Sequence, residues 1–526
     1  MPRTLVLLIV ISYSLSNVYS ARILGLFPHP GKSHQMVFDP LLRELAERGH
    51  DVTVATFFPI ENRTSNYKEV NLQQLAELRL ESFHAGSFEF PSWFTKIPVI
   101  GSVINQYEQH TNLVQTAVEI CEKLVKFQPL NEILKQRYDV VITEIFNSKC
   151  VLGLLDVYGV SAPIIAMSSC PLLPGSAGRV GADDNPSYVP VVTSELTHRM
   201  SFLQRLENMI ANVLIKQIYQ DAYRKEQAVI EGYFAKTVTD LSVLANNISL
   251  VLVNTYHVLD GVYPSVPGMI EIGGIHVSNP ATKQMPKYIE KFLNESEHGV
   301  VLLSFGSQLS STSISQYRQN IFLNSLSKLK ERVLWKHADS ADEGTPVGKN
   351  ILRVRWLPQN ELLQHPKVKA IIAHGGKLGT TEAVSAGKPM VVIPVFADQS
   401  LNAAAIKAAG VGEVIPLPQL TEQDLDTALQ KVLGERMQER ARLVAKMWHD
   451  RESSPLKTAV FWTERVARWG HQSSLYSEAK HLPFYQYALL DVIAFLILMI
   501  SVVIGIIVYA FLRFKGYGKL NKEKAH

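Results

Sequence analysis

The chain alternates between short apolar runs and longer amphipathic segments, a pattern typical of a parallel β-sheet covered by helices. The apolar runs predict strands at 22–27, 51–57, 138–143, 162–167, 299–305, 333–335, 370–373 and 390–394. Amphipathic helices are expected between these strands. Because the alternation starts once near residue 22 and again near residue 299, we expect an α/β protein with two successive parallel-sheet domains.

The first domain is expected to open with a strand, a loop, a helix and a second strand. Ser33 suits the N-cap of that helix, and Gly49 stands where a helix stop belongs. Apolar residues at spacings of three and four predict a long helix over 200–234, which packs against the sheet or, alternatively, lies on a membrane surface. The turn-rich stretch Pro264–Gly268 suits a hinge between the domains.

Both ends of the chain are expected to lie outside the two domains. Arg3, the apolar run 5–11 and the small residues before Ala21 predict a signal peptide. Residues 492–512 carry no charge and are long enough to cross a bilayer as a helix. The basic residues that follow predict a cytosolic tail and, with the signal peptide, a type I topology with a luminal body. The expected segments are a signal peptide at 1–20, domains at 21–265 and 266–487, a transmembrane helix at 488–512 and a basic tail at 513–526.

Two further features agree with this topology. Lys522 and Lys524 resemble a dilysine signal for retrieval to the endoplasmic reticulum, although a basic stop-transfer tail has the same composition. Sequons begin at Asn62, Asn247 and Asn294, and N-glycosylation there is compatible with a luminal body. The sequence therefore predicts a glycoprotein of the endoplasmic reticulum membrane.

Composition narrows the class of protein. The 526 residues are 47% apolar and 19% charged, which allows sizeable cores and excludes a disordered chain. The net charge is +4, but Arg3 contributes one positive charge and the last fourteen residues contribute four, so the body is at −1. A near-neutral body argues against nucleic-acid binding.

Three cysteines are too few for a disulfide scaffold or a zinc site, although one disulfide and one free thiol are possible.

The most informative window, 356–399, begins its central motif at a strand-to-helix turn. The segment His374–Glu382 follows a buried strand and opens a helix, and its glycines allow a phosphate to approach free backbone N–H groups. A glycine turn is also a common packing device when it stands alone. The dinucleotide fingerprint GxGxxG does not follow the first strands, which weakens a hydride-transfer interpretation.

Polar and aromatic groups flank this turn on both sides. Trp356 offers a stacking face for a base, and Gln359 offers a paired donor and acceptor for an imide edge. Asp398 and Gln399 suit the hydroxyl groups of a sugar. Along the chain, these residues thus offer binding sites for a base, a diphosphate and a sugar in turn. All of these sites are expected at the carboxyl ends of parallel strands, where open α/β sheets bind ligands.

This window resembles the signature region of the UDP-glycosyltransferase family, and the resemblance extends to Ser304–Ser307, the N-terminal loop and the anchored tail. The animal membrane-bound branch, and its insect members in particular, are the most similar. The resemblance implies two Rossmann-like domains in the GT-B arrangement, inverting transfer from a UDP-sugar co-substrate to a small lipophilic acceptor, and neither a cofactor nor a metal. The acidic pair Asp424 and Asp426 agrees, because it lies at the start of a helix capped by Thr421.

The resemblance also assigns roles to residues. His34 takes the position of the catalytic base, and Glu144 takes that of the aspartate partner, with one methylene more. His29, in the same loop as His34, is expected to be structural. Leu378 replaces a frequent asparagine. The donor-binding positions are Ser307, Trp356, Gln359, His374, Gly375, Gly376, Gly379, Glu382, Asp398 and Gln399.

The donor and acceptor are less specified. Asn254 stands where vertebrate glucuronosyl members tend to have arginine, which favours UDP-glucose over UDP-glucuronate. The acceptor pocket is expected to form from loops at 58–112 and 170–197, in a protein that acts in detoxification and can form homo-oligomers. A lipid- or sterol-directed transferase and a catalytically weak lipophile-binding protein are the alternatives.

Overall fold

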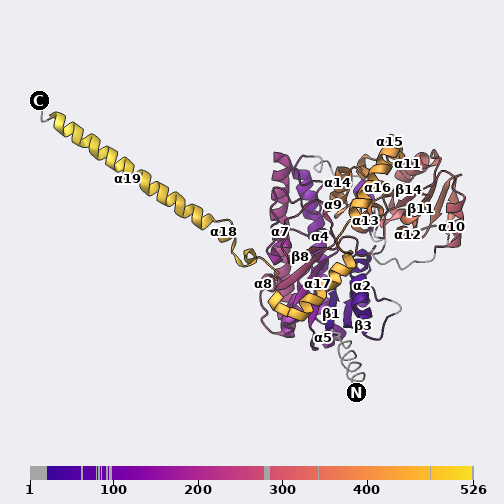
Figure 1. Cartoon of the computed structure of the whole chain (residues 1–526), viewed down its shortest axis with the longest axis horizontal. Coiled ribbons are helices and arrows are strands. Elements are labelled where there is room, and N and C mark those ends of the chain that lie inside the picture. The colour runs from indigo at the N-terminus through magenta and orange to yellow at the C-terminus, as the bar shows by residue number, and fades with distance from the viewer. Residues whose placement is uncertain are drawn as a thin grey trace, which may run out of the picture. The chain divides into compact units, whose positions relative to one another are not determined.

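The computed structural model describes residues 20–523 except 61–62, 79, 81–82, 85, 90–92, 94–96, 278–284, 308, 342 and 474. Residues 1–19 of the expected signal peptide, the sequon residue Asn62 and the last three residues of the expected tail lie outside this part of the chain. The described residues form two compact units, one ending at Tyr476 and one beginning at Ser477. The first unit holds two seven-stranded sheets (Figure 1).

The first sheet is parallel throughout, in the order β3-β2-β1-β5-β6-β7-β8. Its inner strands are mostly apolar and buried, as expected where helices cover both faces of a sheet, whereas the edge strand with the sequence YKEVN is largely polar. The strands of this sheet are β1 (Arg22–Phe27), β2 (Asp51–Thr56), β3 (Tyr67–Asn71), β5 (Val140–Glu144), β6 (Ile164–Ser168), β7 (Ile248–Val253) and β8 (Met269–Glu271). Its helices are α2 (Lys32–Glu47), α4 (Ile100–Leu124), α5 (Gln128–Leu134), α6 (Cys150–Val157), α7 (Phe202–Phe234) and α8 (Leu241–Ala245). The short helix α9 (His257–Asp260) follows β7, and its Leu259 packs in the core of the second sheet.

The second sheet has the order β12-β13-β11-β9-β14-β15-β16 and is parallel except for β12. Its strands are β9 (Val300–Ser304), β11 (Arg332–Lys336), β12 (Thr345–Val347), β13 (Ile351–Val354), β14 (Val368–Ala373), β15 (Met390–Val392) and β16 (Gly412–Val414). Its helices are α10 (Lys287–Asn294), α11 (Gln316–Ser327), α12 (Gln359–Gln364), α13 (Lys377–Ser385), α14 (Gln399–Ala409), α15 (Glu422–Leu433) and α16 (Glu435–His449).

Two segments join the halves of the first unit. Short strands β4 (Phe83–His84) and β10 (Leu309–Ser310) pair with each other, and β4 is followed by α3 (Gly86–Glu89). Helix α17 (Pro455–Trp469) returns from the second sheet and places Ala459, Val460 and Val466 in the core of the first. The chain therefore begins and ends its first unit on the same sheet.

The second unit contains the short helix α18 (Phe484–Tyr487) and the long helix α19 (Leu490–Glu523). Among the described residues, Leu490–Lys515 is the one helical segment long and apolar enough to cross a membrane, with a mean hydropathy of 3.1. It contains the whole uncharged stretch that the sequence analysis identified.

The structure refines three sequence expectations. Helix α2 begins at Lys32 with Gly31 at the N-cap, so Ser33 lies in the first turn and does not cap the helix. Gly49 follows the end of α2 in the left-handed region, with φ of 93°, as a helix stop requires. The stretch Pro264–Gly268 precedes β8, which pairs with β7, so the first sheet extends past the boundary predicted at residue 265.

Candidate active site

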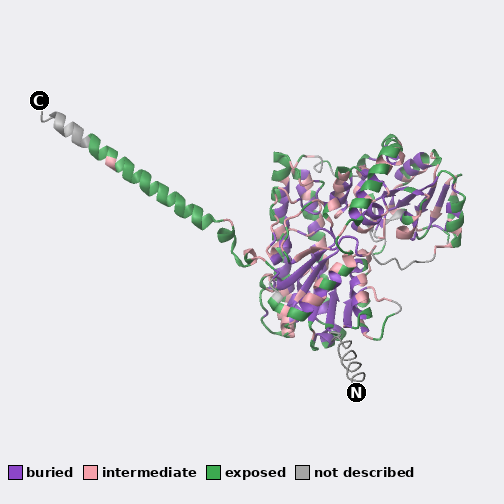
Figure 2. Ribbon diagram, in the orientation of Figure 1, coloured by how far each residue is buried: buried purple, intermediate pink, exposed green. Residues whose placement is uncertain are grey.

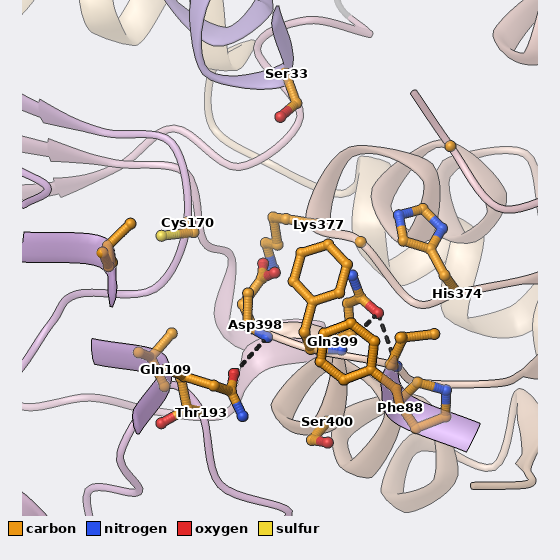
Figure 3. A pocket seen from close by; sticks show the side chains of 18 of the residues that line it. Ser33, Phe88, Gln109, Cys170, Thr193, His374, Lys377, Asp398, Gln399 and Ser400 are labelled. Carbon is orange, nitrogen blue, oxygen red and sulfur yellow. Dashed lines mark hydrogen bonds between the residues drawn. The ribbon is translucent and has the colours of Figure 1, made fainter. Parts of the chain in front are cut away.

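A cavity of about 2340 Å³ is lined by residues of both halves of the first unit. Its walls are loops at the carboxyl ends of strands in both sheets, together with α4 and α7. Figure 3 shows the region around the loop that carries Asp398 and Gln399. The predicted site residues that line this cavity are His34, Ser307, Trp356, Gln359, His374, Gly376, Gly379, Glu382, Asp398 and Gln399.

Two predicted residues stand behind the cavity wall. Glu144 lies at the end of β5 and contacts His34 from the protein side. Gly375 forms the backbone turn before α13 with a φ of 85°, and its carbonyl accepts a hydrogen bond from Asn402 Nδ2 at 2.9 Å. Glycine is needed there because a side chain in this conformation would be strained.

His34 and Glu144 meet because β1 and β5 are neighbours in the sheet, which brings the start of α2 beside the end of β5. Nδ1 of His34 contacts Oε1 of Glu144. The Glu144 side chain is 3% exposed, whereas that of His34 is 14% exposed and reaches the cavity. With the proton on Nδ1 held by the carboxylate, Nε2 is the nitrogen that accepts a proton from a hydroxyl group. The longer arm of glutamate therefore reaches the histidine.

Ser169 adds a second contact to this pair. Its hydroxyl donates to Glu144 Oε1 at 3.2 Å and lies 2.9 Å from His34 Nδ1. Asn254 fixes the backbone here, since its Nδ2 donates to the Ser169 carbonyl at 2.8 Å and its Oδ1 accepts from Gly274 N at 3.2 Å. Asn254 is fully buried and is not among the described residues that line the cavity. Asn254 thus holds the backbone of Ser169, whose hydroxyl contacts both His34 and Glu144.

The His29 ring stacks on that of His34, with centroids 3.9 Å apart and planes 23° from parallel. His29 Nδ1 also accepts a hydrogen bond from Gly31 N at 3.1 Å. His29, His34 and Glu144 place one ligand atom each within 4.8 Å of one another, a spacing that fits a metal ion. Stacked rings, however, hold their in-plane lone pairs in nearly parallel planes, whereas the lone pairs of metal ligands converge on one point.

His374 is wedged between two glycines. A Cβ at Gly306 would lie 2.6 Å from the ring's Cε1, and a Cβ at Gly376 would lie 2.5 Å from its Nε2. Burial, together with the Lys336 cation, lowers the pKa of His374 to about 4, so the ring is neutral at pH 7. Its Nδ1 is buried without a hydrogen-bond partner among the described residues. An orphaned polar atom beside the open N-terminus of α13 favours an anionic ligand.

Three more of the predicted donor-binding residues, Trp356, Gln359 and Glu382, also line the cavity. Trp356 is 51% exposed, and the ammonium groups of Lys32 and Lys336 lie 5.3 and 5.1 Å from its ring centroid. Gln359 Nε2 donates to Glu382 Oε2 at 2.7 Å. Burial raises the pKa of Glu382 to about 7, and this hydrogen bond opposes the rise. An indole face and a linked amide and carboxylate are thus available for a nucleoside.

Asp398 and Gln399 project from a strained loop. Ala397 has a φ of 57°, which is rare for a residue with a side chain, and its N–H donates to Gln109 Oε1 at 2.8 Å (Figure 3). The amide oxygen of Gln399 accepts two backbone N–H groups of this loop at 2.9 and 3.2 Å. Asn402 Nδ2 donates to Asp398 Oδ2 at 2.9 Å. These bonds fix the loop that carries both side chains.

The sequence analysis missed Ser169, Lys377 and His276. Lys377 pairs with Asp260 of α9, with side chains only 2% and 4% exposed. Burial raises the pKa of Asp398, while the Asn402 hydrogen bond and the Lys377 cation lower it. His276 Nε2 lies 3.8 Å from Glu382 Oε1, and burial lowers the pKa of His276 to about 4. The position of Lys377 within the glycine turn could have indicated a role at the site. The sequence around Ser169 and His276 contains no pattern that indicates such a role.

Comparison with known proteins covers nearly the whole chain. The family model for UDP-glucuronosyl and UDP-glucosyl transferases matches residues 26–525. The chain belongs to this family. It is a UDP-glycosyltransferase, and a UDP-sugar is its donor.

Relatives in the family come from insects and mammals. The chain is 36% identical to the UDP-glycosyltransferase UGT5 of Dactylopius coccus, over 94% of this chain and 92% of that protein. It is 30% identical to the UDP-glucuronosyltransferase 2A2 of Homo sapiens, over 100% and 98% of the two chains. The resemblance seen in the sequence is thereby confirmed.

A solved structure confirms the fold. The chain superposes on the crystal structure of the glycosyltransferase of kitacinnamycin with a TM-score of 0.54 and 18% identity, covering 85% of this chain and 98% of that one. Together with the two parallel-sheet halves, this shows the predicted GT-B fold.

Proposed function

We propose that the enzyme transfers glucose from UDP-glucose, or alternatively glucuronate from UDP-glucuronate, to a hydroxyl group of a small lipophilic acceptor, with inversion at the sugar carbon. The observation that carries this proposal is the contact of His34 with Glu144 at the wall of the cavity that His374 and Asp398 also line. A base, an anion-binding turn and a sugar-binding loop therefore share one cavity.

In the proposed reaction, His34 Nε2 removes the proton from the acceptor hydroxyl as its oxygen forms a bond to the anomeric carbon. The bond between that carbon and the diphosphate breaks, and its electron pair leaves with UDP. Glu144 stabilises the imidazolium that forms, and Ser169 keeps the pair aligned. His374 and the N-terminus of α13 bind the departing diphosphate, so no metal is required.

The donor residues take the following proposed roles. Trp356 stacks on the base, Gln359 reads its imide edge, and Glu382 accepts hydrogen bonds from the ribose. Asp398 and Gln399 bind the sugar hydroxyls. Ser307, Gly375, Gly376 and Gly379 shape the phosphate site.

Two observations support a neutral donor sugar. Asn254 is occupied by backbone hydrogen bonds, and Lys377, which lines the cavity, is paired with Asp260. An additional carboxylate on the donor would thus meet a lysine that is already neutralised. This arrangement favours UDP-glucose.

The proposed setting is the endoplasmic reticulum membrane, with a type I topology, a luminal body and a role in detoxification. The apolar segment Leu490–Lys515 supports a membrane anchor. The disulfide Cys121–Cys150 supports an oxidising compartment. Asn247 and Asn294 are both exposed, as glycosylation sites must be.

The proposal is tested by UDP release from membranes that contain the full chain. UDP-glucose and UDP-glucuronate are each supplied with 1-naphthol as the acceptor. We expect acceptor-dependent release that is faster with UDP-glucose. Saturable UDP binding without release would favour the lipophile-binding alternative, and release only with sterol or lipid acceptors would favour the lipid-directed transferase.

A further inference from the structure

A chain of hydrogen bonds crosses the wall of the cavity where α4 packs along α7. We call it the polar chain; its members, in order, are Tyr219, His110, Thr193, Gln106, Ser102 and Glu207. All of them except Tyr219 line the cavity. Four lie in the stretches 58–112 and 170–197, from which the acceptor pocket was expected to form. This position suits contact with the acceptor.

The proton positions at the inner end of the polar chain follow from the chemistry of its members. Burial lowers the pKa of His110 to about 4, so the ring is neutral at pH 7 and carries a single N–H. The one hydroxyl proton of Thr193 goes to Gln106 Oε1 at 3.2 Å. Thr193 Oγ1 therefore accepts from His110 Nε2 at 3.2 Å, and His110 Nδ1 accepts from the Tyr219 hydroxyl at 3.1 Å.

The outer end of the polar chain continues in the same direction. Gln106 Nε2 donates to Ser102 Oγ at 3.2 Å, and Ser102 Oγ donates to Glu207 Oε1 at 2.6 Å. Glu207 is partly exposed and lies near the start of α7, which Figure 2 shows as exposed. Every donor in these bonds thus points from the buried interior toward the Glu207 carboxylate.

This direction leaves hydrogen-bond acceptors on the cavity wall. Thr193 has given its proton to Gln106 and keeps a second lone pair, and the Glu207 carboxylate can only accept. Gln106 has a second N–H, but the residue is only 1% exposed. Glu195, two residues after Thr193, adds another carboxylate to the lining. A ligand group beside these atoms must therefore donate a hydrogen bond.

The lysines of the cavity do not offset these carboxylates. Among the described residues that line it, the lysines are Lys123, Lys336 and Lys377. Lys377 is paired with Asp260, and Lys336 lies over the indole of the donor region. Lys123 is seventeen residues beyond Gln106 on α4, roughly 25 Å along the helix axis. A carboxylate on the acceptor would thus meet like charges at the polar chain.

The position of the polar chain on α4 indicates how long an acceptor must be to reach it. The carbonyl of Leu113 accepts a hydrogen bond from Asn147 Nδ2 at 3.0 Å, and Asn147 follows Glu144 by three residues. This turn of α4 therefore passes the loop after the catalytic pair. Gln106 precedes Leu113 by seven residues, roughly 10 Å along the helix axis. Two linked aromatic rings cover such a distance.

We propose that the polar chain is a second recognition site for the acceptor, which binds a hydroxyl or ammonium group at the end remote from the reacting hydroxyl. This inference rests on the proposed transferase function. The bound group donates to Thr193 Oγ1 or to the Glu207 carboxylate, and a carboxylate in the same place is disfavoured. The substrate class implied is a two-ring phenol that carries a second hydrogen-bond donor.

Four phenols of one shape test the proposal with the full chain in membranes and UDP-glucose as the donor. They are 4,4′-dihydroxybiphenyl, 4-hydroxybiphenyl, 4′-(aminomethyl)biphenyl-4-ol and 4′-hydroxybiphenyl-4-carboxylate. We expect kcat/KM for the diol and for the ammonium compound to exceed that for 4-hydroxybiphenyl at least fivefold. The carboxylate should react at least fivefold more slowly than 4-hydroxybiphenyl.

The two equivalent hydroxyl groups of the diol supply a twofold advantage without any recognition. A diol advantage of twofold or less would therefore overturn the proposal. A carboxylate that reacts as well as 4-hydroxybiphenyl, or an ammonium compound that reacts no better, would overturn it as well.

Two variants assign the effect to the polar chain. Thr193→Val keeps the shape of the side chain but removes its lone pairs, and should reduce the diol advantage to about twofold. Glu207→Gln removes the negative charge, and should lower the ratio of kcat/KM for the ammonium compound to that for the carboxylate at least tenfold. These ratios cancel any change in the amount of folded enzyme. Wild-type ratios in both variants would overturn the proposal.

The matched controls are Thr111→Val and Glu122→Gln. Both residues are on α4, are exposed and are not among the described residues that line the cavity. Both variants should keep the wild-type ratios.

Binding separates this inference from the proposed transfer. If the wild type releases no UDP with any phenol, the proposed transfer fails. The Kd values of the four biphenyls for the UDP-bound protein, measured by calorimetry, then decide the inference alone. Tighter binding of the diol and the ammonium compound than of 4-hydroxybiphenyl would support it, and equal Kd values would overturn it.

Discussion

Nδ1 of His34, in the first turn of α2, hydrogen-bonds to Oε1 of Glu144, the last residue of β5. The contact fixes the tautomer of the imidazole and directs Nε2 to the cavity. It also provides a buried carboxylate that stabilises the ring when it takes a proton. The chemistry of the proposed site depends on this relationship more than on any other.

Glu144→Gln should lower kcat for UDP release roughly 100-fold or more, because an amide neither fixes the tautomer nor neutralises the imidazolium. The Kd for UDP should change less than about twofold, since Glu144 is not among the described residues that line the cavity. Steady-state kinetics and calorimetry measure the two effects. Glu144→Asp keeps the charge and should be intermediate; a Gln variant with wild-type kcat would remove Glu144 from the mechanism.

Gly376→Ala should weaken UDP binding about tenfold or more. The φ of −60° at Gly376 suits alanine, so the effect is purely steric: the new Cβ would lie 2.5 Å from His374 Nε2 and would displace the ring. Loss of one hydrogen bond to a charged group costs roughly 1.5–3 kcal/mol. Gly178→Ala is the control, because no atom lies within 4 Å of the added Cβ. Calorimetric titration with UDP compares them; equal Kd values would argue against the assigned role of His374.

UDP affinity should fall as the pH falls from 8 to 6. Burial raises the pKa of Glu382 to about 7, so the carboxylate takes up a proton in this range and loses its capacity to accept from ribose hydroxyls. Below the pKa, the slope for one proton approaches tenfold per pH unit. In the Glu382→Gln variant, UDP affinity should lose this pH dependence. It should keep only the dependence that comes from the terminal phosphate of UDP, whose second ionisation lies near pH 6. Identical pH profiles of Kd would contradict the assignment.

The disulfide Cys121–Cys150 should stabilise the first half of the protein. It joins α4 to α6 across a sequence separation of 29, and a loop of this size contributes roughly 3 kcal/mol. Reductant should lower the thermal midpoint by about 5 °C or more. Without reductant, the double variant Cys121→Ala/Cys150→Ala should already have the thermal midpoint of the reduced wild type. Reductant should not lower its midpoint further. A wild type that is insensitive to reductant would show that the bond contributes no stability.

Much of the fold could be predicted because parallel strands are buried on both faces and therefore read as apolar runs. β1 was predicted with its bounds, and the other predicted strands agree to within a few residues. The glycine turn at Gly375–Gly379 was visible because the backbone requires glycine at Gly375, with a φ of 85°, and because a Cβ at Gly376 would lie 2.5 Å from His374 Nε2. The family resemblance placed His34 and Glu144, and the pairing of β1 with β5 explains why they meet.

Contacts between distant segments that the family resemblance did not indicate could not be predicted. Lys377 and Asp260 are separated by more than a hundred residues, and neither has a local pattern that names its partner. Ser169 acts through its position at the end of β6, a place that many serines occupy without a role. The sequence analysis interpreted Asn254 only through the arginine that vertebrate glucuronosyl members tend to have at this position. In the structure, the Asn254 side chain donates a hydrogen bond to the backbone carbonyl of Ser169.

The central claim is that His34 is the base. The most direct measurement is acceptor-dependent UDP release by His34→Ala. His298→Ala is the control, because His298 is exposed and is not among the described residues that line the cavity. We predict that His34→Ala loses at least 100-fold in kcat while its Kd for UDP stays within about twofold, and that His298→Ala matches the wild type. Near wild-type turnover by His34→Ala would contradict the account.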